Sequence, residues 1–251
     1  MKVMQLGANN VTAMNATSMK QNSVKTASKP ELCDKKSIGA IPSSKLQGAF
    51  GLVPSFGRVQ LDTVNLKKHV FMNVFKPLTA SFVELERDVS MDLAKVKNTL
   101  AAWGYKANYL YDIAYNFENG CRPQEKFYMI ETGDGKATNF MELRFPNPVA
   151  KEKVLEVRFL QSSPEIADKA RASKIKGSGE LALYEATKLA KENKIPKVVL
   201  TSVRDSFYEK VGFKKTEQLT ENSSEFELTE SMYDDFMKRI ESKYNLKSIR
   251  S

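Results

Sequence analysis

Hydrophobic and polar positions follow no helical or strand period over the first 58 residues, and a regular pattern begins only after about Val70. The first segment is rich in Ser, Asn, Thr, Lys and Gly and poor in large apolar side chains. Such a segment buries too little surface to offset the entropy that is lost on ordering it. We therefore predict a disordered leader at residues 1–58 and one folded domain at residues 59–251.

A strand and two helices are predicted at the start of that domain. Residues 79–86 carry β-branched and aromatic side chains over the length of a strand. Four apolar residues then recur at helical spacing: Leu93, Val96, Leu100 and Trp103. Gly104 ends this helix. The aromatic-rich residues 109–117 predict a second helix, which Asn119 and Gly120 close.

Three strands follow, and a tight turn joins the first two. Residues 126–132 and 137–145 flank the turn Gly133-Asp134-Gly135, where glycine reaches the positive φ that such turns need. Residues 153–161 have the composition of a third strand. Because the connections are short, we predict an antiparallel meander.

A crossover helix then connects two strands that we predict to be parallel. Residues 181–193 put apolar side chains on one helix face, and Pro196 cannot continue that helix. A strand, a helix and a buried strand in succession favour parallel pairing of residues 153–161 with residues 197–203. The remaining predicted elements are a short helix, a strand and a C-terminal helix, at residues 206–211, 225–228 and 231–244.

The net charge of +9 at first suggests a nucleic-acid partner, but most of it belongs to the leader. Eight Lys or Arg and two acidic residues fall within residues 1–58, which leaves residues 59–251 a surplus of only three. A nearly neutral body argues against a nucleic-acid surface on electrostatic grounds, and only the leader itself is a candidate for such binding. N-termini rich in small and hydroxylated residues and poor in acidic ones are also typical of export and transit signals. The leader is therefore either a disordered segment or a targeting signal.

Cysteine and histidine usage argues against a metal site or a Cys-His nucleophile pair. Cys33 and Cys121 have no CxxC spacing, and His69 is the only histidine. Two cysteines make no disulfide framework, which suits a reducing compartment. No apolar stretch approaches the roughly 20 residues that span a bilayer, and the first residues lack a secretory apolar segment. We expect a soluble, cytoplasmic protein without a metal or a membrane partner.

The most informative local pattern is a basic, glycine-containing loop before the predicted helix at residues 181–193. It comprises Lys174, Ile175, Lys176, Gly177, Ser178, Gly179 and Glu180. The first backbone N–H groups of a helix have no partner within it, and the helix dipole favours an anion there. Glycines let the main chain approach phosphate oxygens closely. The loop therefore predicts a diphosphate site, with an ordinary flexible loop as the alternative.

A second motif follows one helix and one strand later, as Phe207-Tyr208-Glu209-Lys210 and then Gly212-Phe213. It resembles the tyrosine-bearing helix ending in Gly-Phe of the GNAT N-acetyltransferases, and Lys174-x-x-Gly177-x-Gly179 is similar to that family's coenzyme loop. The resemblance covers about residues 70–235. It implies an α/β (α+β) fold of the GNAT acyl-CoA N-acyltransferase type, a mixed central sheet with splayed parallel strands four and five and flanking helices.

Two features depart from the pattern of that family. Residues 166–173 are extra, because the family keeps a short link between the strand-end Pro164-Glu165 and the coenzyme loop. Residues 203–208 form a shorter stretch than is common and lack the asparagine often found there. The first departure bears on the geometry of the loop, and the second on contacts to the coenzyme.

The resemblance implies acetyl-CoA as co-substrate, with its pantetheine arm in the gap between the splayed strands. Unpaired main-chain groups of the fourth strand would bind the arm, at Phe159, Leu160, Gln161 and Ser162. The diphosphate would lie on the loop from Lys174 to Glu180, and no metal is implied.

The resemblance also implies a general acid and a general base. Tyr208 occupies the family's acid position, where it would protonate the departing thiolate; a tyrosine that merely packs beside the sulfur is the alternative. Glu156 on strand four and Glu142 on strand three are the candidate bases, with His69 a remote third.

The implied function is an N-acetyltransferase that moves the acetyl group of acetyl-CoA to a primary amine of a small molecule or protein, acting as a monomer or homodimer. Aromatic residues between positions 103 and 117 fall where this fold lines the acceptor side, which favours an acceptor less polar than a simple polyamine. The alternative is a non-catalytic module of the same fold that binds acyl-CoA as a regulatory ligand or serves as an exported effector.

Overall fold

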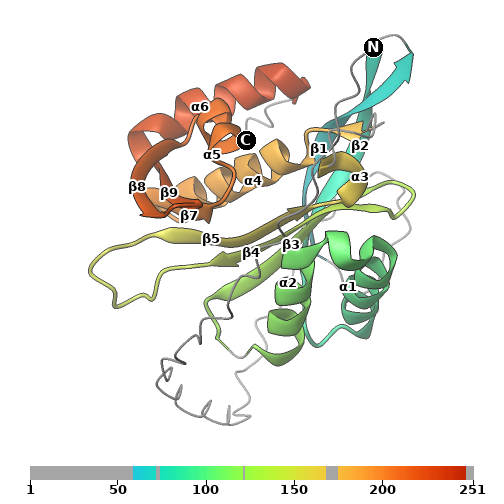
Figure 1. Ribbon diagram of the computed structural model, residues 1–251, viewed down its shortest axis with the longest axis horizontal. Helices are drawn as coiled ribbons and strands as arrows, with labels where there is room; N and C mark the ends of the chain where they lie inside the picture. The colour runs from blue at the N-terminus through green and yellow to red at the C-terminus, as the bar shows by residue number, and fades with distance from the viewer. Residues whose placement is uncertain (1–58, 72–73, 121, 168–174, 247–251) are drawn as a thin grey trace, which may run out of the picture. The chain divides into compact units, whose positions relative to one another are not determined.

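The computed structural model describes residues 59–71, 74–120, 122–167 and 175–246 (Figure 1). The predicted leader at residues 1–58 lies outside the described residues. So do Lys174 of the predicted diphosphate loop and most of the extra segment before it. In the described part of the chain, no helix is both long enough and apolar enough to cross a membrane.

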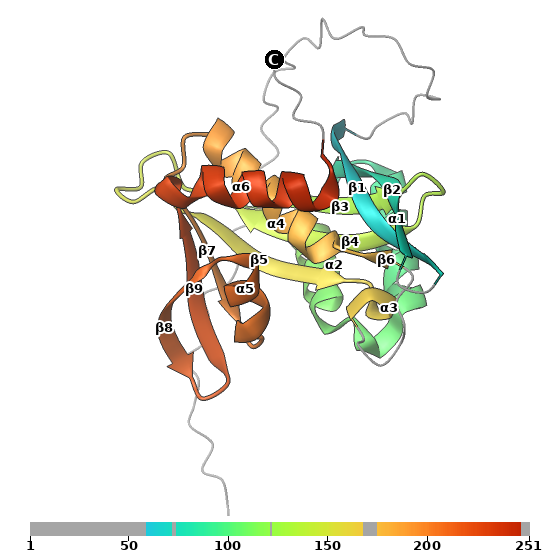
Figure 2. The same ribbon diagram turned by 90° about the horizontal axis from the view of Figure 1, so that it is seen from above.

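The described strands form a single mixed sheet with the order β6-β1-β2-β3-β4-β5-β7-β9-β8 (Figure 2). Their bounds are β1 (Val59–Phe71), β2 (Val74–Leu85), β3 (Glu125–Thr132), β4 (Ala137–Arg144), β5 (Leu155–Ser162), β6 (Ile175–Lys176), β7 (Lys197–Ser202), β8 (Lys214–Thr220) and β9 (Ser223–Thr229). All neighbouring pairs are antiparallel except β5 and β7, which are parallel. The predicted meander and the predicted parallel pair are both confirmed.

Helices cover both faces of the sheet (Figure 1). Their bounds are α1 (Ser90–Trp103), the 3-10 turn η1 (Gly104–Lys106), α2 (Asn108–Asn119), α3 (Pro164–Ala167), α4 (Ser178–Glu192), α5 (Asp205–Val211) and α6 (Glu230–Tyr244). Helices α1 and α2 lie on one face, whereas α4 and α6 lie on the other. The predicted mixed α/β fold is therefore what the chain adopts.

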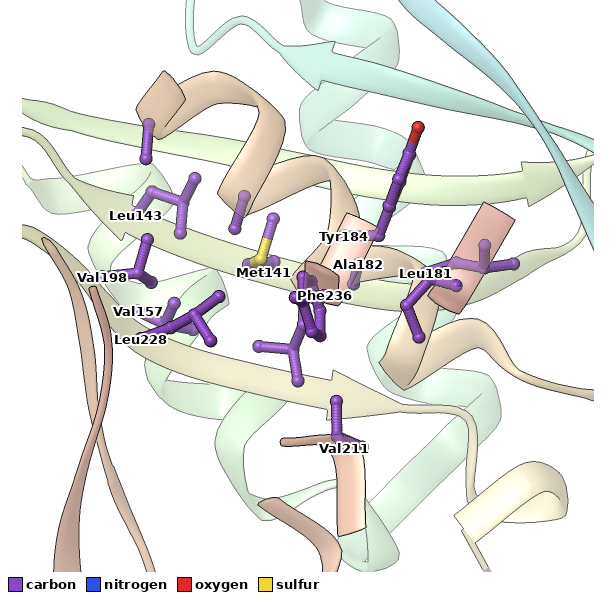
Figure 3. Packing of buried hydrophobic residues seen from close by; sticks show 14 of the residues in the cluster. Met141, Leu143, Val157, Leu181, Ala182, Tyr184, Val198, Val211, Leu228 and Phe236 are labelled. Atoms are coloured by element: carbon purple, nitrogen blue, oxygen red, sulfur yellow. The ribbon is translucent and has the colours of Figure 1, made fainter. Parts of the chain in front are cut away.

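The central strand β4 shows why the sheet needs helices on both sides. Phe140 points into the core under α1 and α2, whereas Met141 and Leu143 point into the core under α4 and α6 (Figure 3). Side chains of neighbouring residues leave a strand on opposite faces, so β4 contributes apolar side chains to both cores, although other buried residues of this strand are polar. Burying each such apolar side chain contributes roughly 2 kcal/mol. Tyr184 of α4 and Phe236 of α6 pack in the same core as Met141 and Leu143.

The structure corrects the sequence prediction at the start of the domain. Periodicity indicated order only after about Val70, yet β1 begins at Val59 and pairs with β2 along most of its length. Only Val64 and Leu66 of β1 are fully buried hydrophobic residues. Its remaining side chains are largely polar or exposed, so the alternation is too weak to recognise in the sequence.

Candidate functional site

The parallel strands β5 and β7 are paired over only three positions. Leu155, Glu156 and Val157 of β5 face Val198, Val199 and Leu200 of β7. Beyond this point β5 continues to Ser162 beside β4, whereas β7 continues to Ser202 beside β9, and the two strands diverge (Figure 2). Within the described residues no strand pairs with this edge of residues 159–162. Backbone N–H and C=O groups on such an edge need another partner.

The four residues predicted to bind pantetheine lie in this unpaired stretch of β5. Leu160 packs against the core under α4, and Phe159 packs against the core under α2. Gln161 is buried, and its Nε2 donates to the carbonyl oxygen of Ser162 at 2.7 Å. The sequence therefore identified the segment whose outer edge the fold leaves open.

The start of α4 lies against the open end of β5. Ser178, the first residue of the helix, is fully buried, and its Oγ lies 3.4 Å from the Oγ of Ser162. A Cβ added to Gly179 would lie 3.4 Å from both the Ser162 hydroxyl oxygen and the ring of Phe207. The first turn of α4, the end of β5 and helix α5 therefore meet at one place, where unpaired helix N–H groups adjoin an open strand edge.

The residues just before this helix lie elsewhere in the sheet. Ile175 and Lys176 form β6, which pairs with Lys68 and Lys67 of β1. The Lys176 ammonium group lies 4.9 Å from the centre of the Phe75 ring, a cation–π geometry. The chain thus enters α4 from the β1 edge of the sheet.

The C-terminal turn of α6 packs on the same loop. Lys243 Nζ donates to Glu180 Oε1 at 2.8 Å, and the Tyr244 hydroxyl donates to Glu180 Oε2 at 2.9 Å. Burial, followed by the nearby Glu180 carboxylate, raises the pKa of Tyr244. Glu180 is favourably placed in the first turn of α4, and Lys243 neutralises its charge. Without Lys243, this carboxylate would repel an anion at the helix start.

Gly177 is required at this contact for two reasons. Its φ of +101° is a conformation that residues with a Cβ rarely adopt, and an added Cβ would lie 2.6 Å from the Tyr244 hydroxyl oxygen. We expect Gly177→Ala to destabilise the fold by about 3 kcal/mol, combining backbone strain and overpacking. Chemical denaturation measures this difference.

Two further variants separate the causes of that effect. Gly177→Ala combined with Tyr244→Ala should cost less than the sum of the two single changes, because the steric clash disappears while the backbone strain stays. Gly133→Ala is the matched control, since an added Cβ there meets no atom within 4 Å. Equal stabilities for Gly177→Ala and Gly133→Ala would contradict the packing described here.

Tyr208 lies on α5, on the β7 side of the divergence. Its ring packs against those of Phe207, Phe213 and Phe226, with centroids 4.9, 6.2 and 5.6 Å away. Burial among these rings raises the pKa of Tyr208 to about 12, so the phenol stays protonated at neutral pH. An ordinary phenol has a pKa of about 10, which is closer to the thiol pKa of about 8.5 than the raised pKa of Tyr208 is.

Gly212 explains why α5 stops where the sequence motif does. Its φ of +102° ends the helix, and its N–H and that of Phe213 both donate to the Tyr208 carbonyl oxygen at 2.9 Å. The Gly-Phe pair thus fixes the backbone of Tyr208 while Phe213 packs against its ring.

Tyr109 is a site residue that the motifs did not identify. It lies in the first turn of α2, and its ring centroid is 6.1 Å from that of Phe159 in the open stretch of β5. It also interacts electrostatically with Tyr208, which contributes to the raised pKa of that residue. The aromatic content of residues 109–117 was the only signal in the sequence. It did not distinguish Tyr109 from its neighbours.

The two candidate bases belong to one network of charges on the α2 side of β3, β4 and β5. Glu142 is 0% exposed, accepts from Asn116 Nδ2 at 2.9 Å, and lies 3.2 Å from Arg158 Nη1. Burial raises the pKa of Glu142, and the Asn116 and Arg158 contacts oppose this shift. The same Arg158 nitrogen donates to Glu125 Oε1 at 2.7 Å.

Glu156 lies at the other end of this network. Arg144 donates to Glu156 at 2.9 Å and to Glu125 at 3.1 Å, so the guanidinium groups connect the two candidate bases through Glu125. Glu156 faces Val199, where β5 and β7 are still paired, and lines a cavity of about 210 Å³. A larger cavity of about 500 Å³ lies between Leu61, Tyr128 and Leu189. Neither cavity is lined by residues 159–162.

No protein-family model matches the chain, and no curated protein matches it by sequence. Solved structures similar to it include a GNAT-family acetyltransferase from Listeria monocytogenes, with 15% identity, 61% of this chain and 95% of that chain covered, and a TM-score of 0.41. A spermidine/spermine N-acetyltransferase from Vibrio cholerae has 16% identity, coverage of 62% and 96%, and a TM-score of 0.44. An N-acyl amino acid synthase from uncultured soil microbes has 14% identity, coverage of 62% and 93%, and a TM-score of 0.43.

Proposed function

We propose that this chain is a GNAT-type N-acetyltransferase that moves the acetyl group of acetyl-CoA to a primary amine. The observation that supports it most is the junction of two features, the open edge of β5 and the first turn of α4. An extended chain with amide groups suits an open strand edge, and a diphosphate suits a helix start. Pantetheine linked to a diphosphate has both groups in that order.

Each residue of the junction has a role in the proposal. Main-chain groups of Phe159, Leu160, Gln161 and Ser162 hydrogen-bond the pantetheine amides. The N–H groups of Ser178, Gly179 and Glu180 bind the diphosphate, while Lys243 keeps the Glu180 carboxylate from repelling it. The close approach of Gly179 to Ser162 favours this arrangement, since a side chain there would crowd the ligand. Lys176, two residues before the helix, adds positive charge, and Lys174 is proposed to do so from outside the described residues.

The chemistry needs one proton removed and one supplied. As the amine nitrogen attacks the thioester carbonyl carbon, an N–C bond forms and the C–S bond breaks; the amine proton goes to a base and the sulfur receives one from Tyr208. The Tyr208 hydroxyl has no hydrogen-bond partner among the described residues, so it is available to the sulfur. Glu142 or Glu156 is the proposed base, acting directly or through water.

Binding without turnover is the second candidate function. It is favoured by the ion pairs of Glu142 with Arg158 and of Glu156 with Arg144, because each carboxylate would have to leave its guanidinium partner to reach an amine proton. A regulatory acyl-CoA module would retain the junction of β5 and α4 and need no free base. Thiol release in the presence of amines distinguishes the two candidates.

Calorimetric titration with acetyl-CoA tests the shared part of both proposals. We expect saturable binding, and at 100 times Kd a stabilisation of about 2.7 kcal/mol, seen as a higher Tm. Gly179→Ala should fold normally, because the added Cβ makes only ordinary contacts, yet bind about tenfold more weakly. Gly133→Ala, in the β3–β4 turn where an added Cβ meets no atom within 4 Å, should bind like the unmodified protein. No binding of any acyl-CoA would refute the proposal.

A further inference from the structure

Three aromatic rings lie where β5 and β7 diverge, which is where the proposed acceptor amine would meet the thioester. Two of them belong to α2 and β5, and the third belongs to α5 on the β7 side. Tyr109 of α2 and Phe159 of β5 have ring centroids 6.1 Å apart, tilted by 40°. Tyr208 lies across from them and interacts electrostatically with Tyr109. Tyr109 is 42% exposed despite these contacts, so part of its ring is available to a bound molecule. Rings in this arrangement favour an apolar or aromatic group.

The charges on this side suit a single ammonium group. Asp112 lies three residues after Tyr109, on the same side of α2, is exposed, and forms no ion pair with a described residue. By contrast, Glu142 and Glu125 are both bound by Arg158, whose guanidinium carbon lies 5.7 Å from the centre of the Phe159 ring. Asp112 thus has no cationic partner among the described residues, whereas Arg158 lies close behind the Phe159 ring and Arg204 lies near Tyr208.

A polyamine fits these charges poorly. Each further ammonium group would need its own carboxylate, and the buried acids nearby already have guanidinium partners. A second positive charge near Phe159 would also be repelled by Arg158. A monoamine with an apolar group avoids both costs, because its ammonium meets Asp112 and its apolar group meets the rings.

We infer that the acceptor is a primary monoamine carrying an aromatic or branched aliphatic group, recognised by Tyr109, Phe159 and Asp112. This inference rests on the proposed acetyl transfer and adds the substrate class. Tyr109 and Phe159 bind the apolar group, and Asp112 attracts the ammonium group before it loses a proton to the base.

A panel of amines tests the inference with acetyl-CoA and thiol detection. We expect 2-phenylethylamine and 3-methylbutylamine to give a kcat/KM at least tenfold above that of spermidine. Tyr109→Ala should reduce kcat/KM for 2-phenylethylamine about tenfold, and Asp112→Asn should raise KM about threefold. Tyr111→Ala, an exposed tyrosine of the same helix, is the matched control and should change it less than twofold.

The possible outcomes separate this inference from the proposed function. Preference for spermidine, or equal losses for Tyr109→Ala and Tyr111→Ala, overturns the inference and leaves acetyl transfer intact. If no amine releases thiol, saturation-transfer NMR of 2-phenylethylamine on the CoA-loaded protein decides. A saturation-transfer signal that disappears in Tyr109→Ala supports the inferred class of amine. Absence of that signal in the unmodified protein overturns the inference. Failure to bind acetyl-CoA at all is instead the failure of the proposed function.

Discussion

Tyr208→Phe is expected to lower kcat by about 100-fold while leaving the Kd of acetyl-CoA unchanged, because general acid catalysis typically contributes 10²–10⁴-fold. The change removes one oxygen and keeps the ring that packs against Phe207, Phe213 and Phe226. Since burial raises the pKa of Tyr208 to about 12, the phenol stays protonated between pH 8 and pH 10. Any loss of activity between pH 8 and pH 10 must therefore come from another group. Steady-state kinetics and a pH profile measure both effects.

Tyr115→Phe provides the control, because Tyr115 is a highly exposed tyrosine of α2 outside the proposed site. It should leave kcat within twofold of the unmodified value. A Tyr208→Phe variant with full turnover would remove Tyr208 as the acid and favour a tyrosine that only packs. If neither the variant nor the unmodified protein shows turnover but both bind acetyl-CoA, the non-catalytic module is the better description.

Glu185→Gln is expected to stabilise the protein by about 3 kcal/mol at pH 7 and by about 5 kcal/mol above pH 8, given about 1.4 kcal/mol for each unit of pKa shift. Glu185 of α4 is 2% exposed, and its Oε1 has no hydrogen-bond partner among the described residues. Burial, and then the Asp62 carboxylate, raise its pKa from 4.5 to about 8. Lys188 opposes this shift only partly, because it also forms an ion pair with Asp62.

The sign of the pH dependence follows from the direction of that shift. As pH rises through 4.5 the unfolded chain releases the Glu185 proton while the folded chain keeps it, so this residue's contribution destabilises the fold progressively up to about pH 8. Urea denaturation at a series of pH values should show this slope in the unmodified protein and a flatter one in Glu185→Gln. Glu192→Gln, on an exposed position of the same helix, should keep the slope. A slope unchanged by Glu185→Gln would mean that this carboxyl is ionised in the folded state.

The sequence predicted the central part of the fold because its signals there were local and strong. The Gly133-Asp134-Gly135 turn between two apolar segments specifies the β3–β4 hairpin. The helix between residues 181 and 193, flanked by two apolar strands, specifies the parallel pair of β5 and β7. The strand β1 escaped prediction because only Val64 and Leu66 reach the core. The short strand β6 depends on pairing with β1, which lies far away in the sequence.

The same distinction holds for the candidate site. The loop from Gly177 to Glu180 and the open stretch of β5 were recognised from motifs, and the fold brings them together. The contacts of Tyr244 and Lys243 with that loop join residues more than sixty positions apart, so no local pattern predicts them. Tyr109 likewise became a candidate only through its distance to Phe159. The motifs also gave no sign that Glu142 and Glu156 both lie in an arginine network.

Only three backbone positions join β5 to β7, and this short seam connects six strands on one side with three on the other. A molecule laid along the open edge would add hydrogen bonds where the seam ends and hold the two parts of the sheet together. The empty protein should then open more readily and be cut sooner by proteases than the loaded one. If that molecule is the proposed acetyl-CoA, the lifetime of the protein in a cell would follow the supply of acetyl-CoA.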